Sequence, residues 1–342
     1  MKLGVFDHMD RGQAPLAEFF EDRLRLLEAY DAAGFHGYHV AEHHATPLGV
    51  APSPGAWIAA AAQRTKRIKL GPLVYLLPLY NPLKLFEEIC MLDQMSSGRL
   101  LLGVGRGISP IELRYYGLDP DKTPGMFREG LEVILRAMKG GTLDFQGEHY
   151  SYAGVPIEIE PYQRPNPPLW YGLGRPEQIP WAAANRVNIV GNLFAQGMRG
   201  LTDAYRREWD RIGGAPEDMP LMGTGRHVVV AETEAEAMEV AKRGYVKWRT
   251  SFLKLWKLHG IMPVMHAVFP ERWEDAEAEG RAVAGTPDKV RDFLLREAKA
   301  GGVNYLLCRF AFGDITGAES LRSLDLFVRH VMPDLLAYDG NG

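Results

Sequence analysis

The chain has 342 residues, of which 46% are hydrophobic, so it is long enough to bury a large core. Its formal net charge of −4 is small for this length and its basic residues form no runs, which argues against nucleic acid or an anionic membrane as the main partner. The two cysteines, Cys90 and Cys308, form no CxxC pair and adjoin apolar stretches, which predicts buried thiols in a reducing compartment. The N-terminus has no signal-peptide run and no stretch approaches the about 18 apolar residues of a membrane helix, so we expect a cytoplasmic protein.

Short apolar, strand-like runs alternate with helical segments along the whole chain. The predicted helices include residues 15–33, which end at Gly34, and residues 56–64, 82–95 and 126–139. The predicted strands are residues 2–6, 38–41, 68–77, 100–104, 169–172, 187–190, 225–230 and 303–308. Parallel strands need crossover connections, and eight such units favour closure into a (β/α)8 TIM barrel over an open sheet. We therefore expect an α/β protein with one domain over residues 1–342.

Two stretches interrupt this alternation, after the fourth and the seventh strand. Residues 142–168 contain DFQGEHYSY, which predicts a small hairpin before a proline-rich connection. Residues 252–285 carry large apolar side chains first and an acidic run at 271–279 second. Long insertions in barrels are often lids. We expect the second insertion to be a lid over the site, the alternative being a fixed extra helix that caps the barrel.

A polar cluster, Glu42-His43-His44, directly follows the second predicted strand. The carboxyl ends of barrel strands face the active site, where an imidazole can act as acid, base or hydrogen-bond donor. The alternative is a hydrogen-bonded cluster at a strand end with no chemical role. A metal site with His36 and His39 is disfavoured, because strand alternation turns His36 to the opposite side from His39 and His43.

Two glycine turns follow the fourth and fifth strands. The first spans residues 103–107 and contains Arg106, which could pair with a phosphate; Ile108 breaks the GxGxxG spacing of a dinucleotide fingerprint. The second contains Gly172, Gly174 and Arg175 and precedes a helix expected near residue 176, an arrangement that suits a phosphate. Ordinary strand-to-helix turns without an anion are the alternative for both. His8, after the first strand, and Arg309, after the last, add polar groups at strand ends.

In this order, the segments resemble the bacterial luciferase-like family of flavin-dependent monooxygenases. Residues 41–44 (AEHH) resemble the luciferase EHH motif, and residues 92–99 (LDQMSSGR) with 103–107 (GVGRG) resemble a longer family block. Residues 285–287 (GTP) and 331–333 (VMP) match two late segments. The resemblance thus covers essentially the whole chain.

The resemblance implies a (β/α)8 barrel that uses reduced flavin mononucleotide (FMN) and dioxygen. It places His43 at the catalytic histidine, Arg106 at a flavin-phosphate contact and a non-proline cis peptide between Leu73 and Val74. The other cofactor-binding residues that it implies are Glu42, Gly107, Ile108, Gly172, Gly174 and Arg175. We expect substrate contacts at His8, His44 and Arg309, and no metal.

The chain departs from luciferase at Gly105, where luciferase has a reactive cysteine, and at Ala311, where it has a glutamate. These changes argue against light emission and a long-chain aldehyde substrate. We expect a monooxygenase that oxygenates a small organic substrate with reduced flavin from a separate reductase, because the chain lacks a nicotinamide fingerprint. We also expect a homodimer that pairs through helices 56–64 and 82–95. The alternatives are a deazaflavin (F420)-dependent oxidoreductase, a non-enzymatic flavin-binding relative and a metal-dependent barrel hydrolase.

Overall fold

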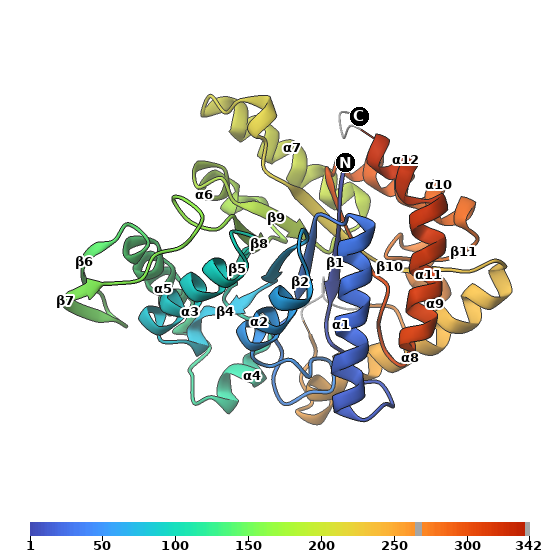
Figure 1. The fold of residues 1–342 in the computed structure, drawn as a ribbon, viewed down its shortest axis with the longest axis horizontal. Coiled ribbons are helices and arrows are strands. Elements are labelled where there is room, and N and C mark those ends of the chain that lie inside the picture. Colours follow the sequence, from blue (N-terminus) through green and yellow to red (C-terminus); the bar gives the residue numbers. More distant parts are fainter. Residues whose placement is uncertain (264–268, 339–342) are drawn as a thin grey trace.

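In the computed structural model, which describes residues 1–263 and 269–338, parallel strands form the expected barrel (Figure 1). All eight predicted strands are present. They are β1 (Lys2–Asp7), β2 (Gly37–Val40), β3 (Lys69–Pro72) continued by β4 (Tyr75–Leu76), β5 (Leu102–Gly105), β8 (Leu169–Gly172), β9 (Asn188–Gly191), β10 (Met222–Val230) and β12 (Tyr305–Arg309). β3 pairs with β2, β4 pairs with β5, and Leu70 bridges Leu100, so the third strand position closes the ring. The prediction of a TIM barrel is confirmed.

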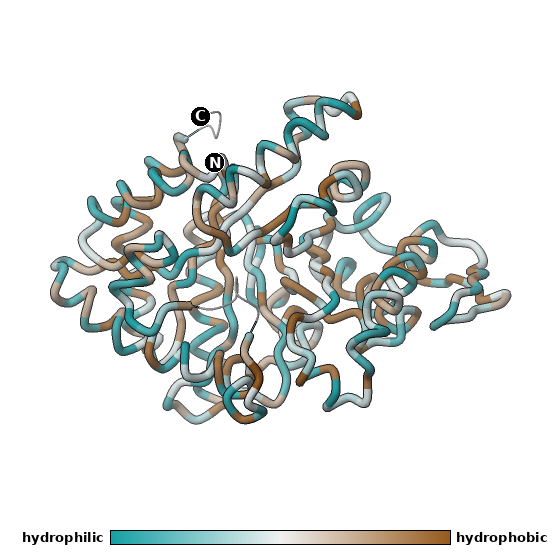
Figure 2. Tube along the Cα trace, turned by 180° about the vertical axis from the view of Figure 1, so that it is seen from behind, coloured by the Kyte–Doolittle hydropathy of each residue, from teal (hydrophilic) through white to brown (hydrophobic). Residues whose placement is uncertain are grey.

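Helices cover the outside of this ring (Figure 1). The long ones are α1 (Leu16–Ala33), α2 (Pro54–Arg64), α3 (Pro82–Met95), α5 (Thr123–Ala137), α7 (Ala195–Arg211), α8 (Glu234–Leu258), α10 (Pro287–Gly301) and α11 (Gly317–His330). Shorter ones are α4 (Pro110–Tyr115), α6 (Ile179–Ala184), α9 (Trp273–Ala278), α12 (Met332–Ala337) and the 3-10 turns η1 (Leu77–Leu79), η2 (Pro176–Gln178) and η3 (Pro216–Asp218). α1 ends at Gly34 with φ of 85°, as its sequence predicts. Figure 2 shows apolar and polar segments alternating along these outer helices, as expected for helices with one buried face.

The barrel interior is a packed core. Large side chains such as Trp170, Tyr305 and Leu307 fill it, and glycines on neighbouring strands make room for them. A Cβ at Gly4, for example, would lie 1.9 Å from the Tyr305 hydroxyl. His39 belongs to this core, where its Nε2 lies 3.0 Å from the Tyr305 hydroxyl. A ligand can therefore bind only above this layer, at the strand ends.

The LDQMSSGR segment holds the barrel wall together. Asp93 accepts hydrogen bonds from the backbone and side-chain nitrogens of Gln163, at 2.7 and 2.8 Å. Arg99 donates to the carbonyls of Ala62 and Ile68, at 2.9 and 3.0 Å. The segment therefore ties α3 to its neighbours and has a structural role.

The first predicted insertion is confirmed as an antiparallel hairpin of β6 (Gly141–Gln146) and β7 (Ser151–Ile157). It projects from the side of the barrel beyond α5 (Figure 1). No helix of the described residues is long and apolar enough to cross a membrane.

The second predicted insertion is less of a loop than its sequence suggests. α8 runs through the first residues of this insertion and ends at Leu258. The side chains of Trp248, Phe252, Leu255 and Trp256 continue one apolar face of the helix at helical spacing. The last residues of the insertion form β11 (Ala282–Gly285), which pairs with the C-terminal part of β10 and extends the sheet. Between them, α9 buries Trp273, exposes Asp275 and leaves Glu274 and Glu277 half-buried. Residues 264–268, which the sequence also assigns to the lid, lie outside the described residues.

Candidate active site

The His43 side chain lies at the mouth of the barrel, just after β2, and has an acidic partner. Its Nδ1 is 3.3 Å from Oε1 of Glu112. The other oxygen, Oε2, accepts the backbone N–H of His44 at 2.9 Å, so the carboxylate is fixed at two points. Glu112 stands on α4, whose first turn is capped by the Ser109 side chain. An acidic group thus fixes the orientation of the candidate catalytic imidazole.

Glu112 is charged in this position. Burial raises the pKa of its carboxyl, but the charge and hydrogen bond of His43 and the amide of His44 lower it more, and the net pKa lies below its usual value. A carboxylate at this distance orients the imidazole and selects which ring nitrogen carries a proton. The pair can therefore hold a proton at His43 or release it.

Glu42 and His44 form a second, more buried network. Glu42 accepts hydrogen bonds from the backbone N–H of Leu76 and the hydroxyl of Tyr80, both at 2.9 Å. His44 places Nε2 2.9 Å from Glu42 and Nδ1 2.8 Å from the Tyr116 hydroxyl. Both ring nitrogens of His44 are thus occupied, and a substrate contact there would require one of these bonds to break.

On the other side of His43 lies His8, at the end of β1. The two rings are nearly parallel, with centroids 5.9 Å apart. Trp248 of α8 donates its indole N–H to Nδ1 of His8 at 3.4 Å, and Trp248 also packs against His227 of β10. Burial, together with the charge of Arg309, holds the pKa values of His8 and His227 well below the usual range. Both imidazoles are therefore neutral at physiological pH.

Arg309 completes this side of the mouth. The side chain is buried, with 4% of its surface exposed. Its Nη2 donates to the side-chain oxygen of Asn192 at 3.0 Å, and the guanidinium lies 4.9 Å from the centre of the Phe6 ring. Burial, and then the nearby charge of Arg226, lower its pKa to about 9, so it remains a cation at neutral pH.

The two glycine turns lie next to each other, because β5 and β8 pair directly. Arg106 and Arg175 are exposed, and among the described residues neither has an ion pair or a side-chain hydrogen bond. Gly107 has φ of 90°, which a residue with a side chain rarely adopts, and a Cβ at Gly172 would meet no atom within 4 Å. Ile108 is about half exposed. The helical segment expected near residue 176 begins there as the 3-10 turn η2 and continues directly into the short helix α6. The two turns therefore offer an anion two cations and exposed backbone.

The peptide bond between Leu73 and Val74 is cis, at the position that the resemblance predicts. It faces Gly105 of β5, where a Cβ would lie 2.3 Å from a methyl carbon of Val74. A side chain at position 105 would therefore collide with the Val74 side chain.

The cavity that touches His43 is small. Its volume is about 20 Å³, and its walls come from the loop after β2, from α4 and from the end of α8. The lining residues are His43, Thr46, Leu48, Ile108, Ser109, Glu112, Phe252, Leu255 and Trp256. A space of this size holds about one water molecule. A larger substrate can enter only if one of these walls moves.

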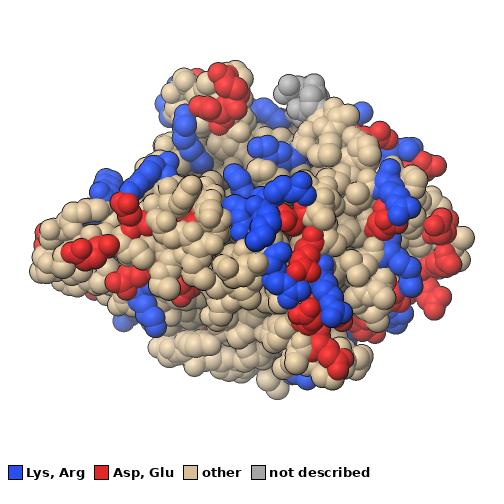
Figure 3. Space-filling view, in the orientation of Figure 1, with Lys and Arg blue, Asp and Glu red and all other residues tan. Residues whose placement is uncertain are grey.

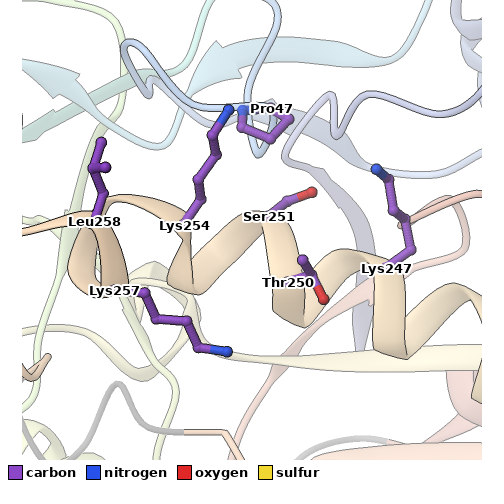
Figure 4. A pocket seen from close by; sticks show the side chains of 7 residues that line it. All are labelled: Pro47, Lys247, Thr250, Ser251, Lys254, Lys257 and Leu258. Carbon is purple, nitrogen blue, oxygen red and sulfur yellow. The ribbon is translucent and has the colours of Figure 1, made fainter.

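A larger groove, of about 570 Å³, runs along the outer side of α8. Its walls are Pro47, Lys247, Thr250, Ser251, Lys254, Lys257 and Leu258, and Figure 4 shows Lys247 and Lys254 reaching from the helix toward the loop that holds Pro47. None of the sequence-predicted site residues lines it. No group of three or more histidine, cysteine or acidic side chains within residues 1–263 and 269–338 is arranged to hold a metal ion.

Sequence reasoning missed several residues of the site. Glu112 pairs with His43, Tyr80 and Tyr116 belong to the network of Glu42 and His44, and Trp248, His227 and Asn192 surround His8 and Arg309. The pattern Ser109-x-x-Glu112 was a signal, since it marks a helix start. Its glutamate, however, turns to His43, which only the tertiary structure reveals.

The comparisons with known proteins agree with the fold and with the motifs. A family model described as luciferase-like monooxygenase matches residues 1–304. The uncharacterized protein y4wF of Sinorhizobium fredii is 42% identical over 321 residues, covering 94% of this chain and 93% of that protein. The oxygenase component of flavin-dependent trigonelline monooxygenase from Acinetobacter baylyi is 29% identical over 251 residues, covering 70% of this chain and 68% of that protein. The crystal structure of monooxygenase RslO1 from Streptomyces bottropensis superposes with a TM-score of 0.87 at 26% identity, covering 98% of this chain and 99% of that one. The chain therefore belongs to the luciferase-like monooxygenase family.

Proposed function

We propose that the protein is the oxygenase component of a two-component system, which takes reduced FMN from a separate reductase and uses dioxygen to oxygenate a small organic substrate. The observation that carries the proposal is the His43–Glu112 pair at the same barrel mouth as two unpaired arginines, Arg106 and Arg175. The relative from Acinetobacter baylyi, an oxygenase component of a flavin-dependent enzyme, supports flavin over the deazaflavin alternative.

Each part of the mouth has a role in this proposal. Bound reduced flavin would supply the electrons that activate dioxygen. Arg106, Arg175 and the backbone of Gly174 would hold the phosphate, and Leu73 and Val74 would contact the flavin. His43 holds or moves a proton at Nε2, since Nδ1 faces Glu112. The apolar end of α8 excludes water.

Anaerobic binding titrations test the cofactor. We expect reduced FMN to bind more tightly than oxidised FMN, and both more tightly than reduced F420. Tighter binding of F420 than of FMN would replace the proposal with the deazaflavin alternative.

Replacement of Glu112 by glutamine tests its positioning role. We expect turnover to fall by about 10- to 100-fold, the effect of one hydrogen bond to a charged group, while the affinity for reduced FMN stays unchanged. The affinity is spared because Glu112 contacts His43 and none of the proposed phosphate residues. Glu112→Asp should partly restore the rate, and Glu18→Gln, at an exposed position of α1, is the control. A rate that Glu112→Asp does not restore, or a weakened FMN complex, would assign Glu112 a purely structural role.

We further propose a homodimer through α2 and α3. Ala56 and Ala60 of α2 are not buried in the chain, and Met91 and Met95 of α3 are about half exposed. Figure 3 shows charged side chains of both signs interspersed over much of one face but few over the region of α2. Light scattering at micromolar concentration should report a dimer, and the double variant Met91→Glu, Met95→Glu should report a monomer. Val246→Glu, at an exposed position of α8, should leave the dimer intact. A monomeric wild-type protein would refute the assignment.

The lid is also a proposal, with revised bounds. Phe252, Leu255 and Trp256 at the end of α8 close the small cavity at His43, so this end must shift before a flavin ring or a substrate can enter. We expect limited proteolysis to cleave the free protein between residues 255 and 284, and FMN with substrate to reduce the cleavage. Cleavage that these ligands leave unchanged would support the fixed cap instead.

A further inference from the structure

Arg309 is a buried cation whose neighbours leave room for its guanidinium group. Tyr305 and Leu307 of β12 point into the barrel, and strand alternation brings Arg309 to the same side, one layer closer to the mouth. The guanidinium lies against Gly225 of β10, where a Cβ would be 2.7 Å from Nη2 and 2.8 Å from Nη1. Any side chain at position 225 would displace it. Phe6 supports the guanidinium from β1.

The hydrogen-bonding capacity of this guanidinium is largely unused. Nη2 donates to Asn192, whereas Nε is buried and has no partner. No carboxylate of the described residues lies within 4 Å of it. Its neighbour Arg226 shows the contrast, because that guanidinium pairs with Glu297 at 3.0 Å. A buried charge without a counter-ion is unfavourable for folding, which indicates that a ligand supplies the missing anion.

The groups around Arg309 leave its charge uncompensated. His8 and His227 are neutral, as described above, and both ring nitrogens of His227 are buried without a hydrogen-bond partner. An imidazole N–H beside a guanidinium offers a further donor to the same anion. This part of the mouth therefore carries one net positive charge and several unused donors.

Arg309 lies across the barrel from the proposed phosphate residues. β12 stands between β1 and β10 in the ring, whereas Arg106 and Arg175 follow β5 and β8 on the opposite side. His43 connects the two sides, because its ring stacks on that of His8. A ligand group at Arg309 would thus leave the flavin side free and hold the rest of the molecule next to His43.

We propose that Arg309 binds a carboxylate of the substrate, so that the enzyme acts on small organic monocarboxylates; this inference rests on the proposed function. A planar guanidinium matches a carboxylate with two parallel hydrogen bonds. A single buried cation also balances a single negative charge, whereas a phosphate dianion would leave one charge buried and unpaired. Asn192 and His227 are placed to complete the set of donors.

Matched acid and amide pairs test the proposal. We would measure binding of acetate and acetamide, benzoate and benzamide, and nicotinate and nicotinamide by isothermal titration calorimetry, with inorganic phosphate as a further anion. Arg309→Gln removes the charge, and Lys254→Gln in the α8 groove is a charge-matched control. Wild-type protein should bind at least one acid more than about 10-fold tighter than its amide, the effect of one charged hydrogen bond. Arg309→Gln should abolish this preference while Lys254→Gln retains it.

The melting temperature, the affinity for FMN and the comparison with phosphate separate this proposal from its alternatives. Arg309→Gln should melt at or above the wild-type temperature, because it removes an unpaired buried charge; a clear loss of stability would assign Arg309 a structural role. Its affinity for reduced FMN should be unchanged, and a weakened FMN complex with acid preference intact would assign the arginine to the flavin. Phosphate binding as tight as that of the acids, or no acid preference in any pair, would overturn the proposal. If the protein binds no FMN at all, the proposed function fails, while the acid preference can still be measured.

Discussion

Replacement of His43 by alanine should lower turnover by about 100- to 10,000-fold, the range that a general acid–base group contributes. Among His8, His43 and His44, only His43 both lines the small cavity and has a carboxylate next to one ring nitrogen. The measurement is product formation with a flavin reductase present, using a substrate found by screening small organic acids and their neutral analogues.

The same variant should bind FMN within about twofold of wild type, because none of the proposed phosphate contacts is altered. His330→Ala, at the exposed end of α11, is the matched control and should keep full turnover. Normal turnover in the His43 variant would reduce the EHH segment to a hydrogen-bonded strand end.

The second large effect concerns the phosphate of FMN. The wild-type protein should bind FMN about 100-fold more tightly than riboflavin, since each of two arginine–phosphate pairs contributes about 10-fold at an exposed site. Arg106→Ala and Arg175→Ala should each weaken FMN binding by about 10-fold and leave riboflavin binding unchanged. Arg114→Ala, an exposed position on α4, should affect neither ligand.

Flavin fluorescence quenching measures all of these affinities. Equal binding of FMN and riboflavin by the wild-type protein would contradict the assignment of Arg106, Gly174 and Arg175. A loss of riboflavin binding in either arginine variant would instead indicate damage to the ring site.

The sequence predicts the barrel well because its signals are local. Each strand is a short apolar run, and helix ends are marked by residues such as Gly34, whose left-handed conformation needs no tertiary contact to explain it. The same holds for the strand-end positions of His43, Arg106 and Arg309. Barrel geometry then brings these positions to one face without further information.

What the sequence does not predict depends on contacts between distant segments. The pairing of Glu112 with His43 spans 69 positions, and the Trp248 contact with His8 spans 240. β11 lies in a segment with no strong strand pattern and is a strand because β10 offers it an unpaired edge. α8 extends into the predicted lid because its apolar face continues past Phe252, so the border between helix and insertion is set by packing rather than by a breaking residue.

The most direct test of the proposed oxygenase function is the fate of reduced FMN when oxygen is added. Protein and reduced FMN would be mixed under anaerobic conditions, then combined rapidly with oxygenated buffer, while absorbance follows the return of oxidised FMN and a peroxidase assay follows hydrogen peroxide. We expect oxidised FMN to return with a delay compared with free reduced FMN, because the closed mouth around His43 keeps water and stray protons away. Oxidised FMN that returns as fast with the protein as without it would contradict the proposed oxygenase function.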